Sequence, residues 1–139
     1  MSARDLPLQD SLHDLLNQAA GVVTQVDPQA RVEPGVRLGE GCRIRCGAVI
    51  ARGTRLGRGV VVGANAVFAD DEDGVGATTV GDAVHIGACA VIDAGLSIGA
   101  GARVKPGAVV LASVAAGAIV AGNPAVVVGQ VEAWVPARV

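Results

Sequence analysis

Two groups of residues near the middle of the chain could do acid–base chemistry. His85 lies between Val84 and Ile86, two apolar residues expected to point inward, so its imidazole is expected to point outward, where it could act as a general base. Asp70 and Asp71 could orient or deprotonate an attacking amine. Each group also has an ordinary interpretation. A lone surface histidine is usually inert, and the acidic run that begins at Asp70 could simply keep a turn in solvent.

Cationic side chains that could bind phosphate fall into two sets. Arg103 and Lys105 are the only cations between Arg58 and Arg138, which makes them candidates for phosphate recognition in the second half of the chain. Seven arginines come earlier and could hold a diphosphate: Arg31, Arg37, Arg43, Arg45, Arg52, Arg55 and Arg58. Alternatively, both sets are solvated charges, which in the earlier set would suppress end-to-end stacking of sheet edges.

The spacing of apolar residues predicts the scaffold that positions these side chains. A large apolar residue stands at every sixth position from Val26 to Val110, interrupted at Gly74. Three positions after many of them stands a glycine, and Asn65 and Asp71 occupy the same frame; these residue types tolerate positive φ. At the position directly after this corner frame, the residue is often small, as in Cys42, Ala48, Thr54, Ala66, Thr78, Ala90, Ala102 and Ala108. A six-residue period with a corner in every repeat predicts a parallel β-helix.

The same pattern divides the chain into three parts. Residues 1–25 contain a helix start at Ser11 and are expected to form a short capping helix. Residues 26–115 form the repeat, with three hexads in each of about five coils and a loop at 68–79. Residues 116–139 form a C-terminal tail in which Trp134 is expected to cap the last coil. If the loop occupies two hexads, His85 lies between Val67 and Arg103 of neighbouring coils, near the acidic residues.

Composition excludes several classes of protein. The 139 residues suit a single domain, and a net charge of −2 gives no electrostatic case for nucleic acid. Residues 107–129 are uncharged and long enough to cross a bilayer, but the hexad pattern continues through them, which favours a subunit interface over a membrane. No secretory signal is evident. Cys42 is expected in the core, and three cysteines without zinc spacing indicate a reduced, cytoplasmic setting.

Several hexads resemble those of the hexapeptide-repeat acyltransferase superfamily, whose members fold as left-handed β-helices. Ile86-Gly87-Ala88-Cys89-Ala90-Val91 is one such hexad, and Ile119-Val120-Ala121-Gly122-Asn123-Pro124-Ala125 resembles the terminal signature of these enzymes. Phe68-Ala69-Asp70-Asp71 is similar to the Phe-Thr-Asn-Asp segment of N-acetyltransferases that act on nucleotide-linked amino sugars. With the six-residue period, the resemblance predicts an all-β fold: a left-handed parallel β-helix of about five coils, with a short N-terminal helix and a C-terminal capping tail.

The resemblance also implies partners and roles for individual residues. Such enzymes are homotrimers with acetyl-CoA between adjacent β-helices, so each site takes residues from two chains and needs no metal. The implied catalytic residues are His85 and Asp70, the implied substrate-binding residues are Asp70 and Asp71, and the implied acetyl-CoA-binding residues are Gly87, Arg103, Lys105 and Asn123.

The chain departs from the family pattern at three points. Asp70 stands where the family has Asn, and the loop that follows is shorter than usual. Leu111-Ala112-Ser113 stands where the family has Thr-Lys-Asp, and Val126 replaces a basic residue after Asn-Pro-Ala. Two cations that lie near the cofactor in the family are therefore missing.

These observations leave two functions open. The first is an acyltransferase that moves an acetyl group from acetyl-CoA to an amine or hydroxyl of a sugar, with a nucleotide-linked sugar as the expected acceptor. The alternative is a non-catalytic trimeric β-helix that acts as a scaffold or regulatory subunit. A zinc hydratase of the same fold would need three histidines around each metal, and His85 is the only histidine in the repeat, so that function is not supported.

Overall fold

The computed structural model describes residues 23–70 and 76–131, and over these residues every regular element is a β-strand. Fourteen of the strands contain two residues each. They are β2 (Gln25–Val26), β3 (Arg31–Val32), β4 (Arg37–Leu38), β5 (Arg43–Ile44), β6 (Val49–Ile50), β7 (Arg55–Leu56), β8 (Val61–Val62), β9 (Val67–Phe68), β10 (Thr79–Val80), β11 (His85–Ile86), β12 (Val91–Ile92), β13 (Ser97–Ile98), β14 (Arg103–Val104) and β15 (Val109–Val110). The last two strands are longer, β16 (Ala118–Gly122) and β17 (Ala125–Gln130).

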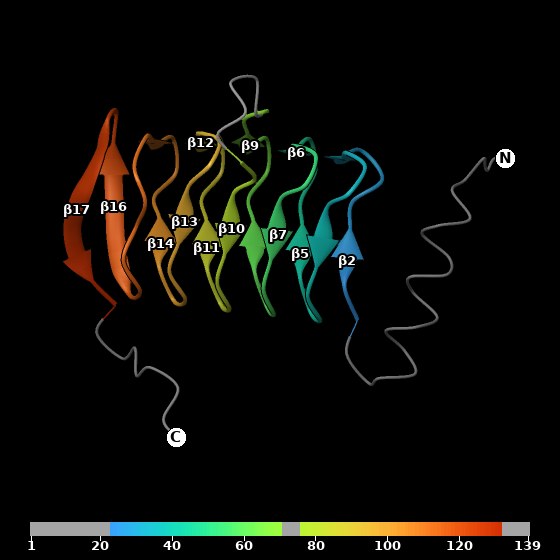
Figure 1. Ribbon diagram of the computed structural model, residues 1–139, viewed down its shortest axis with the longest axis horizontal. Coiled ribbons are helices and arrows are strands. Elements are labelled where there is room, and N and C mark those ends of the chain that lie inside the picture. The colour runs from blue at the N-terminus through green and yellow to red at the C-terminus, as the bar shows by residue number, and fades with distance from the viewer. Residues whose placement is uncertain (1–22, 71–75, 132–139) are drawn as a thin grey trace, which may run out of the picture.

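The strands stack into three sheets, one on each side of a solenoid (Figure 1). The strand orders are β13-β10-β7-β4, β15-β12-β9-β6-β3 and β17-β16-β14-β11-β8-β5-β2. All pairings are parallel except the last, β16 with β17. Successive coils therefore lie directly above one another. The predicted all-β fold, a left-handed parallel β-helix of about five coils, is confirmed.

Two residues per strand are enough because each side of the coil needs one residue pointing in and one pointing out. In β5, for example, Arg43 is exposed and Ile44 is buried. The small residues of the repeat are buried as predicted, Cys42 among them. Between strands, the corner residue takes a positive φ, at Gly53 and Gly101 for example. Asn65, Ala83 and Cys89 adopt the same conformation without being glycine.

The C-terminal end of the solenoid is closed by a hairpin. β16 continues the seven-stranded sheet by pairing with β14, and β17 folds back against β16 after the turn at Asn123 and Pro124. The expected capping helix near Ser11 and the expected cap at Trp134 lie outside the described residues. In the parts of the chain that the structure describes, no helix has the length and apolar character needed to cross a membrane.

Candidate functional site

Four of the sequence-predicted site residues lie together on the outer face of the seven-stranded sheet. They surround a shallow hollow of about 250 Å³ that extends over β8, β11 and β14. The four residues are His85, Gly87, Arg103 and Lys105. His85 on β11 is paired with Arg103 on β14 in the strand register. Each is the exposed residue of its strand, so their side chains are neighbours on the outer face.

Two of the residues that line the hollow are glycines, Gly63 and Gly87. A Cβ atom on Gly63 would lie 2.5 Å from the backbone nitrogen of Ala88, and a Cβ on Gly87 would lie 2.5 Å from that of Pro106. Both contacts are too close for real atoms, so the approach of the next coil excludes a side chain at these positions. Close packing of the coils is therefore enough to explain a glycine at position 87, and the predicted role of Gly87 in binding acetyl-CoA stays a prediction.

His85 has an environment that favours its neutral form. Partial burial lowers the pKa of its imidazole, and the positive charges of Arg103 and then Arg45 lower it further. The imidazole is consequently uncharged at neutral pH and free to accept a proton. This is the protonation state that a general base requires.

The register around His85 differs from the expected one. His85 pairs with Val61 on one side and Arg103 on the other, so the expectation that it lies beside Val67 is wrong. The reason is the connection between β9 and β10, which contains ten residues where the connection between β8 and β9 contains four. The longer connection thus adds six residues without adding a strand to the coil, and each later strand lies one face earlier than expected.

Asp70 is not part of this hollow. It lies two residues after the end of β9 in the five-stranded sheet, where its carboxylate lies 3.9 Å from the Nε atom of Arg52. Asp71 lies outside the described residues. Asn123 is exposed in the turn between β16 and β17 and does not line the hollow either. Within one chain, the structure brings together His85, Gly87, Arg103 and Lys105, and it places Asp70 and Asn123 elsewhere.

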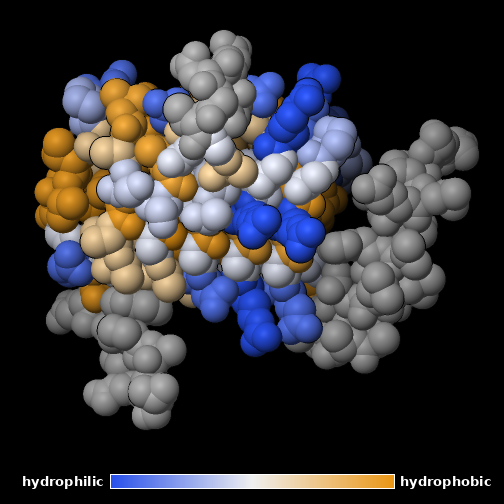
Figure 2. Space-filling model, in the orientation of Figure 1, coloured by the Kyte–Doolittle hydropathy of each residue, from blue (hydrophilic) through white to orange (hydrophobic). Residues whose placement is uncertain are grey.

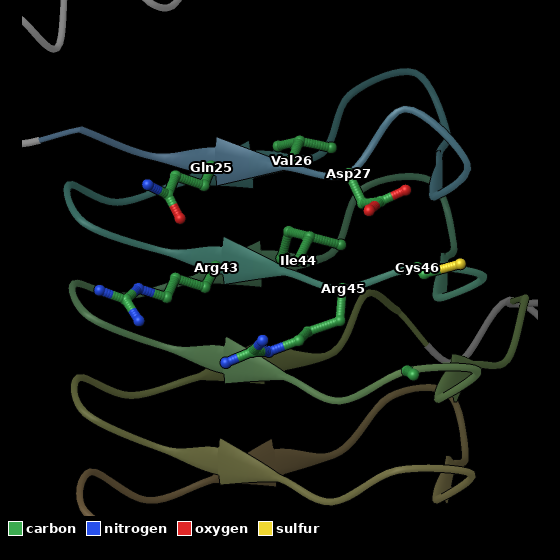
Figure 3. A pocket seen from close by; sticks show the side chains of 8 residues that line it. Gln25, Val26, Asp27, Arg43, Ile44, Arg45 and Cys46 are labelled. Atoms are coloured by element: carbon green, nitrogen blue, oxygen red, sulfur yellow. The ribbon is translucent and has the colours of Figure 1, made fainter.

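A second and larger hollow on the same sheet was not predicted. It measures about 350 Å³ and is lined in part by Gln25, Asp27, Arg43, Arg45 and Cys46 (Figure 3). The sequence contained a signal for it, because two arginines separated by one inward residue must share a face. That signal was hidden among the seven arginines of the first coils.

The described residues contain no metal site. In residues 23–70 and 76–131, no three side chains among His, Cys, Asp and Glu gather closely enough to hold a metal ion. Arg103 and Lys105, by contrast, are the kind of groups that bind phosphate. The chemistry available in the hollow is therefore proton transfer and anion binding.

Known proteins with related folds are acetyltransferases. A GDP-perosamine N-acetyl transferase from Caulobacter crescentus, solved with CoA and GDP-perosamine as a histidine-to-alanine mutant, is 26% identical with a TM-score of 0.62 over 85% of this chain and 66% of that one. The Neisseria gonorrhoeae serine acetyltransferase is 29% identical with a TM-score of 0.68, over 73% of this chain and 41% of that one.

A sequence relative points in the same direction. Serine acetyltransferase 4 of Arabidopsis thaliana is 45% identical over 53 residues, which are 38% of this chain and 15% of the plant protein. No family sequence model matches the chain. The chain thus spans just under two thirds of the perosamine enzyme and a smaller part of the serine enzymes. The resemblance to the hexapeptide-repeat acyltransferases is confirmed by these similarities.

Proposed function

We propose that the chain transfers an acetyl group from acetyl-CoA to an amine or hydroxyl group of a sugar, with a nucleotide-linked amino sugar as the expected acceptor. The observation that carries the proposal is the hollow in which a neutral His85 lies beside two phosphate-binding cations, on a fold shared with acetyltransferases. The perosamine enzyme, with its bound CoA and GDP-perosamine, supports both the donor and the class of acceptor.

In the proposed reaction, His85 accepts the proton of the acceptor amine or hydroxyl as this group attacks the thioester carbonyl. A new C–N or C–O bond forms, the C–S bond breaks, and the thiolate of CoA leaves and takes up a proton. Backbone N–H groups of a stacked coil suit stabilisation of the developing oxyanion. Arg103 and Lys105 would bind phosphate groups of CoA, with Gly87 and Asn123 as further contacts, and Asp70 with Asp71 would orient the acceptor.

A homotrimer in the cytoplasm is part of the proposal. The pantetheine arm of CoA is several times longer than the strand spacing of about 4.8 Å that separates His85 from Arg103. A CoA molecule whose phosphates contact Arg103 is therefore favoured to place its thioester at the His85 of a neighbouring copy. This geometry also allows Asp70 to reach the site from another chain.

Apolar side chains on the surface support association of copies. Leu111 and the run Val126, Val127 and Val128 are each more than half exposed. Figure 2 shows the end of the molecule formed by β16 and β17 as hydrophobic, whereas hydrophilic side chains gather nearer β5. Exposed apolar groups of this kind are typical of interaction surfaces. The three unpaired cysteines, Cys42, Cys46 and Cys89, agree with a reducing compartment.

The second candidate is a trimeric scaffold or regulatory subunit without catalytic activity. Ala112 and Val126 stand where the family has cationic side chains near the cofactor, and this departure favours a chain that does not bind acetyl-CoA. Titration calorimetry with acetyl-CoA separates the two functions. Micromolar binding supports the transferase, and no binding at millimolar concentration supports the scaffold.

His85→Gln tests the catalytic role, with His13→Gln as the matched control because these are the only two histidines. With a thiol reporter to follow CoA release, we expect kcat of His85→Gln to fall by about 100-fold and acetyl-CoA binding to stay unchanged. His13→Gln should turn over normally. Equal turnover of both variants would remove His85 from the mechanism.

A further inference from the structure

Two rows of cations flank His85 on the outer face of the seven-stranded sheet. One row lies on and beside β14, where Arg103 and Lys105 border the His85 hollow. The other lies on and beside β5, where Arg43 and Arg45 line the larger hollow. The register gives the order of strands as β5, β8, β11 and β14, so His85 on β11 is next to the first row and two strands from the second.

Among residues 23–70 and 76–131, Arg43 and Arg45 have no acidic partner. No ion pair or side-chain hydrogen bond joins either guanidinium to another residue in the described part of the chain. Asp27 lines the same hollow, but its Oδ1 atom accepts a hydrogen bond from the backbone N–H of Gln29 at 2.8 Å. Figure 3 shows the carboxylate of Asp27 turned away from both guanidinium groups.

Arg31 and Arg52 differ in this respect, whereas Arg37 and Arg55 also lack an ion pair among the described residues but line neither hollow. Arg31 is paired with Glu33 at 2.9 Å, and Arg52 lies 3.9 Å from Asp70. Two guanidinium groups on one face with no counter-ion repel each other, and a bound dianion would relieve the repulsion. The planar donors of arginine match phosphate in particular.

The side chain of Arg45 points from the larger hollow toward the strand that borders the His85 hollow. Figure 3 shows its side chain extending away from β2 across the next strand of the sheet, β8. Gly63, which directly follows that strand and lines the His85 hollow, has no side chain. The positive charge of Arg45 also contributes to the lowered pKa of His85. A ligand bound by Arg43 and Arg45 could therefore extend over β8 to the imidazole.

We propose that Arg43 and Arg45 bind a phosphate or diphosphate group of the acceptor and so hold its nucleophile at His85. This inference rests on the proposed function and assigns to Arg43 and Arg45 the recognition of the phosphate groups that a nucleotide-linked or otherwise phosphorylated acceptor carries. Two strand spacings separate the anion site from the base, about 10 Å along the sheet. A free amino sugar would leave the anion site empty and be a poor acceptor.

A pair of double variants tests this assignment. Arg43→Gln with Arg45→Gln removes the site, and Arg37→Gln with Arg55→Gln is the matched control, because Arg37 and Arg55 are neighbouring outward arginines on the four-stranded sheet. Inorganic pyrophosphate is titrated by calorimetry in the presence of saturating CoA, which occupies the site proposed at Arg103 and Lys105. Circular dichroism checks that each variant is folded.

We expect the first double variant to bind pyrophosphate at least about tenfold more weakly than wild type, and the control to bind it normally. In the acetyl-transfer assay, UDP-glucosamine should exceed glucosamine in kcat/KM by at least about tenfold, and only the first double variant should lose this preference. Equal pyrophosphate binding by both double variants would overturn the assignment. Failure of the proposed function would be seen separately, as a lack of CoA binding by wild type.

Discussion

Replacing Gly87 with alanine tests whether coil packing shapes the floor of the site. The new Cβ would lie 2.5 Å from Pro106 N and 2.8 Å from the carbonyl carbon of Lys105, where ordinary contacts begin at 3.4 Å. Both atoms belong to the backbone of the next coil and cannot rotate away. The two coils must therefore separate locally, which strains the hydrogen bond of 2.8 Å from Gly87 N–H to the Val104 carbonyl.

The expected cost combines overpacking with partial loss of that hydrogen bond. Together they amount to about 2–4 kcal/mol in the free energy of unfolding. The matched control is Gly107→Ala, because a Cβ on Gly107 would meet no atom within 4 Å and only the φ of +76° is unfavourable. That strain costs about 1–2 kcal/mol. The displaced backbone also carries Lys105, so Gly87→Ala should weaken acetyl-CoA binding and Gly107→Ala should not.

Urea unfolding followed by circular dichroism measures the two costs, at matched protein concentration because association would change the apparent stability. Calorimetry with acetyl-CoA supplies the second readout. A Gly87→Ala variant as stable as wild type would show that the coils can separate without cost. The packing explanation of the hollow would then be wrong, whatever happened to ligand binding.

Two further predictions concern titratable groups. Arg103→Gln should raise the pKa of His85, because it removes one of the positive charges that lower this pKa. Added salt should raise it as well, since it screens those charges. NMR of the imidazole protons measures the titration, and an unchanged pKa in the variant would contradict the electrostatic account. Since the folded-state pKa lies below the ordinary 6.5, His85 should contribute to stability fully above pH 6.5, and this contribution should be lost as the pH falls through the lowered value. Ellman's reagent should modify Cys46 and Cys89 in the native protein, and Cys42 only after unfolding. Cys42 is fully buried, and burial raises the pKa of its thiol. Rapid reaction of all three thiols in the native protein would contradict the inward position of Cys42.

The fold was predictable because the solenoid repeats one local rule. Each coil side needs an inward aliphatic residue, a corner that accepts positive φ and a small inward residue, and all three recur every six positions. Ile86, Ala90 and Ile92 therefore occupy the buried positions that the period assigned to them. Ala83 and Cys89 were harder to interpret, because their corners adopt φ values near +60° without the residue types that normally reveal such corners.

The site was predictable only in part, because its residues come together by stacking of distant coils. His85, Arg103 and Lys105 were correctly expected in neighbouring rows, since 18 residues separate His85 from Arg103 and this is one full coil. The arginine pair on β5 was not recognised as a separate feature. Its distinction from the other arginines lies in the hollow that it lines, which depends on where side chains of adjacent coils point.

The connection between β9 and β10 decides which residues share a face with His85. Had residues 68–79 supplied two complete hexads, every later strand would lie one face later in the winding order, and His85 would stand beside Val67 on the five-stranded sheet. Because six residues leave the coil, His85 and the cations of β14 are instead aligned with β5 on the seven-stranded sheet. Acidic and glycine-rich residues predict that a loop exists, but not how many of its residues remain in the coil, since that number depends on which register buries Thr78 and Val80. The proposed acceptor site between Arg43 and His85 thus depends on the length of a loop on a different edge of the solenoid.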